Sequence, residues 1–91
     1  MHVKTTRQFE RIVKGFSNHR RIEILILLER QPELSLVEIA DMLGVNFKTA
    51  SEHIWRLTRA ELVMKRNEGK AVRHALTPRG KLILKFLRTL E

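Results

Sequence analysis

The chain has 91 residues, 43% of them hydrophobic, which corresponds to one small folded domain. Eighteen Lys and Arg residues against ten Asp and Glu give a net charge of +8, which favours a polyanionic partner: DNA, RNA or an anionic membrane. The absence of cysteine excludes disulfides, thiolate metal sites and cysteine nucleophiles, and every apolar run is far shorter than the ~20 residues of a membrane span. The N-terminus lacks the apolar stretch of a signal peptide, so we expect a cytoplasmic protein.

An apolar stripe predicts a first helix within residues 4–16, whose end is marked by Gly15, Ser17 and Asn18. The members of the stripe recur three or four residues apart: Phe9, Ile12, Val13 and Phe16. A second helix is expected over residues 19–30, with Asn18 as its N-terminal cap. Because this helix is apolar nearly all round, we expect it to be the central and most buried one.

A helix-turn-helix unit is predicted over residues 35–60. Ser35 and Glu38 form a capping box at the start of its first helix, and Gly44 ends that helix and permits a tight turn. Asn46 can cap the second helix, whose inner face is expected to contain Phe47, Ala50, Ile54 and Leu57. The polar residues of this helix can enter the major groove of DNA, and the candidates are Asn46, Lys48, Thr49, Ser51, Glu52 and Arg56.

Residues 62–76 are expected to form a β-hairpin, because a turn signal at residues 67–70 separates two short strand patterns. The hairpin carries cations that can reach phosphates or the minor groove beside the helix-turn-helix: Lys65, Arg66, Lys70 and Arg73. Thr77 and Pro78 then begin the last helix, expected over residues 78–90, as its N-cap and first helical residue.

The last helix is more apolar than a terminal surface helix of a monomer requires. Its lysines also allow a membrane-surface anchor, but the apolar stripe of the first helix supplies a complementary surface and favours burial in a dimer. The expected interface contains Phe9, Ile12, Val13, Phe16, Leu82, Ile83, Phe86, Leu87 and Leu90.

Three stretches of the chain resemble the ArsR family of winged-helix regulators: residues 18–25, residues 36–57 and residues 62–77. The resemblance implies a winged helix-turn-helix fold, mainly α with a small β-hairpin, in the order α-α-α-α-β-β-α over residues 1–91. It also implies a homodimer joined through its first and last helices, in which two recognition helices read a roughly palindromic operator. Repression by blocking transcription, relieved by a signal, is the mode of action that the resemblance implies.

The chain departs from the family pattern in two places. Family metal sensors often carry cysteines in the helix at residues 35–43 or Asp and His pairs on the last helix; here the first has no cysteine and the second offers only Glu91, so we predict no metal site. Glu61 stands where the family usually has glycine at the end of the recognition helix. Either the helix ends differently here or a left-handed, strained residue is tolerated.

Four further residues are interpreted without a catalytic or metal-binding role. Trp55 and Phe47 are interpreted as packing residues, and His53 and His74 as phosphate contacts or surface residues rather than metal ligands. We predict no catalytic residue, cofactor or small-molecule ligand. The expected partners are double-stranded DNA and a second copy of the chain, and the expected function is sequence-specific transcriptional regulation. The alternatives are a non-specific, chromatin-like nucleic-acid-binding protein with the same fold and a protein-interaction module.

Overall fold

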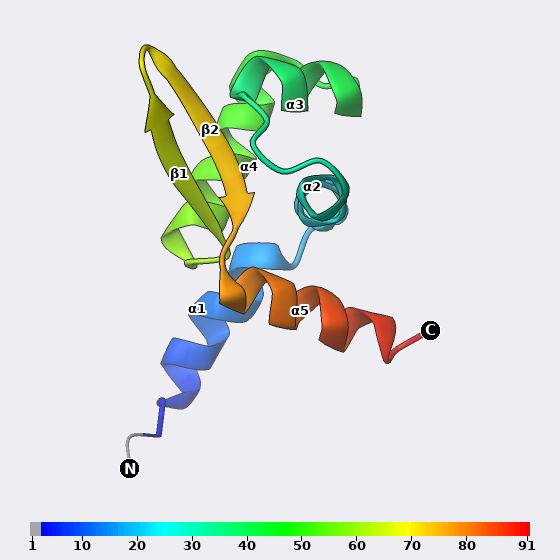
Figure 1. Ribbon diagram of the computed structural model, residues 1–91. Coiled ribbons are helices and arrows are strands. Elements are labelled where there is room, and N and C mark those ends of the chain that lie inside the picture. Colours follow the sequence, from blue (N-terminus) through cyan, green and yellow to red (C-terminus); the bar gives the residue numbers. More distant parts are fainter. Residues whose placement is uncertain (1–2) are drawn as a thin grey trace.

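The computed structural model describes residues 3–91, which form five α-helices and one antiparallel hairpin in the predicted order (Figure 1). The elements are α1 (Thr6–Phe16), α2 (His19–Arg30), α3 (Leu36–Leu43), α4 (Phe47–Arg59), β1 (Val63–Glu68), β2 (Ala71–Leu76) and α5 (Pro78–Arg88). The last helix is shorter than predicted, because it ends at Arg88 and leaves Leu90 beyond its end.

The predicted helix caps are present. Asn18 Oδ1 accepts the backbone N–H groups of Arg20 and Arg21, at 2.9 and 3.2 Å. Ser35 Oγ accepts the Glu38 N–H at 3.2 Å, and the Glu38 carboxylate accepts the Ser35 N–H at 2.9 Å. These bonds satisfy N–H groups that have no partner within the helix, and they determine where α2 and α3 begin.

Helix α2 lies at the centre of the fold, as predicted, and is seen end-on in Figure 1 between α3 and α5. It packs against α3, α4, α5 and β2. The side chains that are shielded almost completely from solvent come from every helix after α1 and from the hairpin: Ile24, Leu25, Leu28, Ile39, Ile54, Leu57, Leu62, Val63 and Leu84. The core is therefore built around α2, and one face of α4 packs against it.

One prediction for α1 is wrong. Phe16, expected at a subunit interface, is only 8% exposed and belongs to the core of its own chain, because it lies where α1 turns toward α2. The helix ends within the expected stretch, with Ser17 as its C-terminal cap, and Gly15 lies buried in its last turn. A Cβ atom on Gly15 would lie 2.4 Å from the Cβ of Ala60, so the missing side chain lets α1 approach the end of α4 closely.

Glu61 adopts the left-handed conformation with φ of 60°, so the strain at the end of α4 is tolerated rather than avoided. The segment leading into α5 holds this turn in place. Thr77 donates its hydroxyl to the Glu61 carbonyl at 2.6 Å, and Arg79 binds the Glu61 carboxylate at 3.1 Å and the Ala60 carbonyl at 3.0 Å. These contacts help to set the direction in which the hairpin leaves the recognition helix.

His74 was expected at the surface, and this prediction is wrong, because His74 is only 2% exposed. The imidazole Nδ1 donates to the Leu34 carbonyl at 2.9 Å, and the His74 backbone N–H donates to the same oxygen at 2.9 Å. The Glu33 N–H completes the bridge by donating to the His74 carbonyl at 2.9 Å. Residues before α3 thus pair with β2, and the histidine ties the hairpin to the helix-turn-helix.

Acid is expected to destabilise the fold through His74. Burial lowers the pKa of this imidazole below its ordinary value of 6.5. The unfolded chain therefore binds more protons than the folded one in this pH range. The contribution of neutral His74 to the free energy of unfolding is complete above pH 6.5 and is lost as the pH falls through the lowered pKa. The melting temperature, followed by circular dichroism, should fall on acidification. His74→Asn keeps a donor near the Nδ1 position but cannot titrate in this range, so its melting temperature should depend less on pH; equal dependence would contradict this role.

Candidate nucleic-acid interface

Helix α4 presents one face to the core and the other to solvent. Ala50, Ile54 and Leu57 are buried, as predicted, whereas Phe47 is 55% exposed because it is the first residue of the helix and lies beyond the core. The prediction of a packing role for Phe47 is therefore wrong. The exposed face consists of Lys48, Glu52, Trp55, Arg56 and Arg59, as the helical periodicity predicts.

The six predicted groove residues of α4 differ in how free they are to act. Asn46 caps the helix: its Oδ1 accepts the Thr49 N–H at 2.8 Å, so its carbonyl oxygen is already engaged. Thr49 and Ser51 are half-buried on the two edges of the exposed face. Lys48, Glu52 and Arg56 are exposed, and they follow one another at helical spacing along a single row.

The hairpin cations fall into two pairs. Arg66 contacts the carboxylates of Glu33 and Glu68, at 3.1 and 3.0 Å. Arg73 contacts Glu38 at 3.2 Å and is only partly exposed. Lys65 and Lys70, by contrast, are exposed and have no ion-pair partner within residues 3–91. Arg66 and Arg73 thus attach the hairpin to the segment around α3, and the two lysines remain the available cations.

Trp55 lies on the exposed face of α4 beside Arg59. Trp55 is 53% exposed, so the hairpin does not cover it. The interpretation of Trp55 as a packing residue is therefore wrong. The Arg59 guanidinium lies 4.9 Å from the centre of the indole ring, which is a cation–π contact. The aromatic surface of the recognition helix is consequently accessible from outside.

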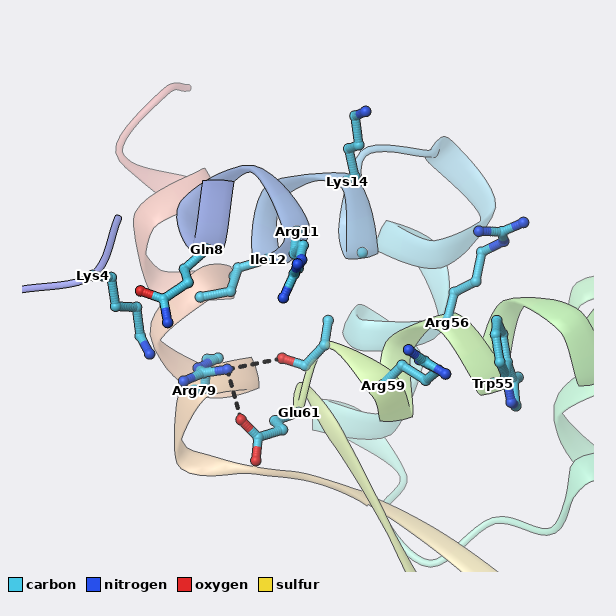
Figure 2. A pocket seen from close by; sticks show the side chains of 12 residues that line it. Lys4, Gln8, Arg11, Ile12, Lys14, Trp55, Arg56, Arg59, Glu61 and Arg79 are labelled. Atoms are coloured by element: carbon cyan, nitrogen blue, oxygen red, sulfur yellow. Dashed lines mark hydrogen bonds and ion pairs between the residues drawn. The ribbon is translucent and has the colours of Figure 1, made fainter. Parts of the chain in front are cut away.

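A hollow of 460 Å³ lies between α1 and the C-terminal half of α4, and Figure 2 shows the side chains around it. Six of its lining residues are cations: Lys4, Arg11, Lys14, Arg56, Arg59 and Arg79. Glu61 is its carboxylate, and that group is engaged by Arg79. Sequence patterns did not indicate this concentration of charge, because its members come from α1 and the segment before it, from α4 and from α5, and meet only through the packing of α1 on α4.

A second polar cluster was only partly indicated by the sequence, which offered His53 as a phosphate contact or surface residue but did not single out Arg21. Arg21 of α2 and His53 of α4 each have a nitrogen, Nε and Nδ1 respectively, that is shielded from solvent and lacks a hydrogen-bond partner within residues 3–91. Burial first, and then the charge of Arg21, lowers the pKa of His53. The available signal was the basic run at residues 19–21, which begins an otherwise apolar helix.

The predicted dimer surface is largely exposed. Helices α1 and α5 both lie in the half of the molecule away from the hairpin tip (Figure 1). The exposed apolar residues are Phe9 (50%), Val13 (50%), Leu82 (65%), Phe86 (55%) and Leu90 (67%). Ile12, Ile83 and Leu87 are half-buried against the core of their own chain, and Phe16 is part of it. We call the five exposed residues the apolar end surface.

Residues 3–91 contain neither a metal centre nor a membrane-spanning helix. No group of three or more His, Asp or Glu side chains in this range is suited to hold a metal ion. None of the helices in the same range has the length and apolar character needed to cross a membrane.

The fold and the exposed recognition helix define a class of protein. A family model described as winged helix-turn-helix DNA-binding matches residues 17–64, which include α2, α3, α4 and the start of the hairpin. The chain therefore belongs to the winged helix-turn-helix DNA-binding family, among the transcriptional regulators of the ArsR and HlyU type. Members of this kind are not enzymes, in agreement with the expectation from the sequence.

Solved structures of similar proteins support this family assignment. The homodimeric winged helix-turn-helix domain of Mb0332 from Mycobacterium bovis, a possible ArsR-family transcriptional regulator, is 29% identical, with a TM-score of 0.80 over 99% of this chain and 88% of that one. HlyU from Vibrio cholerae is also 29% identical, with a TM-score of 0.80 over 98% and 97%. HlyU from Vibrio vulnificus, a transcriptional regulator, is 31% identical, with a TM-score of 0.75 over 93% and 88%. The predicted resemblance to the ArsR family is confirmed.

Proposed function

We propose that this DNA-binding regulator is a sequence-specific repressor that acts as a homodimer on a palindromic operator. The observation that carries the proposal is the division of α4: its apolar side is buried in the core, and the row of Lys48, Glu52 and Arg56 is exposed. An exposed polar helix face following a helix and a tight turn suits the major groove, which is wide enough for an α-helix and differs chemically at each base pair.

Separate residues serve base reading and anchoring in this proposal. Lys48 can donate to the O6 and N7 atoms of guanine, and Glu52 can accept from the amino group of cytosine, with Thr49 and Ser51 at the edges of the same face. Lys65 and Lys70 of the hairpin, which have no carboxylate partner within the described chain, are assigned to phosphates. Backbone contacts of this kind position the protein without selecting a sequence.

The homodimer rests on the apolar end surface. The Mycobacterium bovis domain that this chain matches is homodimeric, and large exposed apolar side chains such as those of α1, α5 and the residue Leu90 beyond it are typical of a protein interface. A two-fold dimer presents two recognition helices in opposite directions, which corresponds to a palindromic site. Occupation of such a site beside a promoter would block transcription.

Selection of binding sites from random duplex DNA, followed by titration of two variants, tests the proposal. Lys48→Ala should weaken binding to the selected site by roughly 5- to 150-fold, with a much smaller effect on unrelated DNA, because it removes a base contact. Lys70→Ala should weaken binding to all sequences about equally and reduce the salt dependence by about one ion. The matched difference between two lysine variants separates base reading from phosphate anchoring.

The selection itself can decide against the proposal. Enrichment of a two-fold symmetric motif supports the homodimeric, sequence-specific function. If no motif emerges and both variants weaken all duplexes alike, the protein is a non-specific nucleic-acid-binding protein with the same fold. The net charge of +8 would then account for its binding, with a steep dependence on salt concentration.

A further inference from the structure

Two shielded side-chain nitrogens, one on α2 and one on α4, have no hydrogen-bond partner within the described chain. They are Nε of Arg21 and Nδ1 of His53. Buried polar groups in folded proteins are nearly always hydrogen-bonded, and leaving one unpaired is costly. Two unpartnered groups on helices that pack together, on side chains that both suit an anionic oxygen, favour an acceptor that another molecule supplies.

The surroundings of these donors are strongly cationic. Arg56 acts on both of them: its charge lowers the pKa of Arg21, after the larger effect of burial, and contributes to lowering that of His53. His19 adds a further titratable group from the start of α2, and Glu52 is the carboxylate that acts on His53. Arg21 has no ion pair within the described residues. Two guanidinium groups and the His19 imidazole thus act on His53 against the carboxylate of Glu52.

The neighbouring residue shows that this arrangement is particular to Arg21. Arg20 also lies in the first turn of α2, but its guanidinium contacts the Glu23 carboxylate at 3.0 Å. One arginine of the pair is therefore paired within its own helix, and the other has no ion pair within the described residues. This difference makes Arg20 a matched control for Arg21.

We propose that Arg21, His53 and Arg56 form a binding site for one phosphate group between α2 and α4. A phosphate oxygen accepts from Arg21 Nε and His53 Nδ1, and Arg56 supplies further charge; guanidinium groups match phosphate both in charge and in geometry. The phosphate is either a phosphodiester of bound DNA or free inorganic phosphate. The first source rests on the proposed function, and Arg56 favours it because this residue lies in the same exposed row as Lys48 and Glu52.

The site has a consequence for pH dependence. A phosphate beside His53 opposes the effects of burial, Arg21, Arg56 and His19 that hold its pKa low, and it adds to the effect of Glu52. Binding should therefore raise the pKa of His53, and affinity for the phosphate should increase as the pH falls from 7.5 toward 6, by linkage between the proton and the anion.

The experiment compares Arg21→Gln with Arg20→Gln, which remove the same charge from adjacent positions. Affinity for duplex DNA is measured at two salt concentrations, and the His53 imidazole is titrated by NMR in the free protein, with duplex DNA and with inorganic phosphate. Arg21→Gln should lower affinity about 10-fold and reduce the salt dependence by about one ion, with less than about a 2-fold loss for Arg20→Gln. In the unchanged protein the pKa of His53 should rise with DNA, and this rise should be absent in Arg21→Gln.

The two sources of phosphate are separated by the probes. A response of His53 to DNA alone assigns the site to the DNA backbone, and an equal response to millimolar inorganic phosphate assigns it to the free anion; either supports the site. No response to either probe, or equal losses in the two arginine variants, would overturn it. His53→Gln provides a second test if Arg21→Gln does not fold: unchanged DNA affinity and unchanged pH dependence would also overturn the site. Failure of the motif selection would reject sequence-specific regulation and leave the His53 response unaffected.

Discussion

Replacing Phe86 by glutamate is expected to convert the proposed dimer into a monomer and to weaken binding to a palindromic operator by about 100-fold or more. Phe86 is 55% exposed on α5, with Leu82 at 65% on the same helix. In the proposed dimer these side chains are buried against the partner subunit. A carboxylate at that position would lose its hydration without gaining a partner, which costs several kcal/mol, about as much as a small interface can supply.

The loss of DNA affinity follows from the loss of the second half-site. When one recognition helix of a dimer is bound, the other is held close to its own half-site, and this effective concentration multiplies the affinity. Lys81→Gln is the control, because it changes the net charge by the same amount at an exposed position of α5. Light scattering and operator titration should show a dimer with nearly normal affinity for Lys81→Gln. A Phe86→Glu protein that remains dimeric would show that the apolar end surface is not the interface.

Gly15→Ala is expected to lower the free energy of unfolding by about 1–3 kcal/mol, the usual cost of an inserted methyl group in a packed interface. The new Cβ would lie 2.4 Å from the Cβ of Ala60, far inside van der Waals contact, so α1 must move away from α4. Without this contact the same substitution in a helix would stabilise the protein by up to about 1 kcal/mol. The two mechanisms therefore predict opposite signs.

Ala60→Gly should restore most of the stability lost in Gly15→Ala. The next nearest atoms to the new methyl group are the Arg56 carbonyl oxygen at 3.7 Å and the Ala60 Cα at 3.8 Å, both ordinary contacts. Urea unfolding of the two single variants and the double variant completes the cycle, with Ala60→Gly alone costing about 1 kcal/mol or less. An additive double variant, or a neutral Gly15→Ala, would mean that this contact does not position α1.

Local features of the sequence determined the elements and the division of the recognition helix. The cap at Asn18, the capping box of Ser35 and Glu38, and the glycine turn at Gly44 act over a few residues, so their geometry follows from spacing alone. The burial of Ala50, Ile54 and Leu57 follows in the same way, because a helix of period 3.6 puts these residues on one face. The order of elements and the exposed row of α4 were predictable for this reason.

Only the tertiary structure decided which side chains are already occupied and which meet from distant parts of the chain. Arg66 and Arg73 read as free hairpin cations in the sequence, but folding brings Glu33 and Glu38 against them. His74 was expected at the surface, but folding buries it and places its imidazole against the Leu34 carbonyl.

The cluster of Arg21 and His53 likewise depends on the tertiary structure. Arg21 and His53 are 32 positions apart by their numbering, and they become neighbours only when α2 packs against α4. The period of a helix specifies the face on which a side chain lies, but the partner across that face depends on how helices pack, which no local pattern encodes.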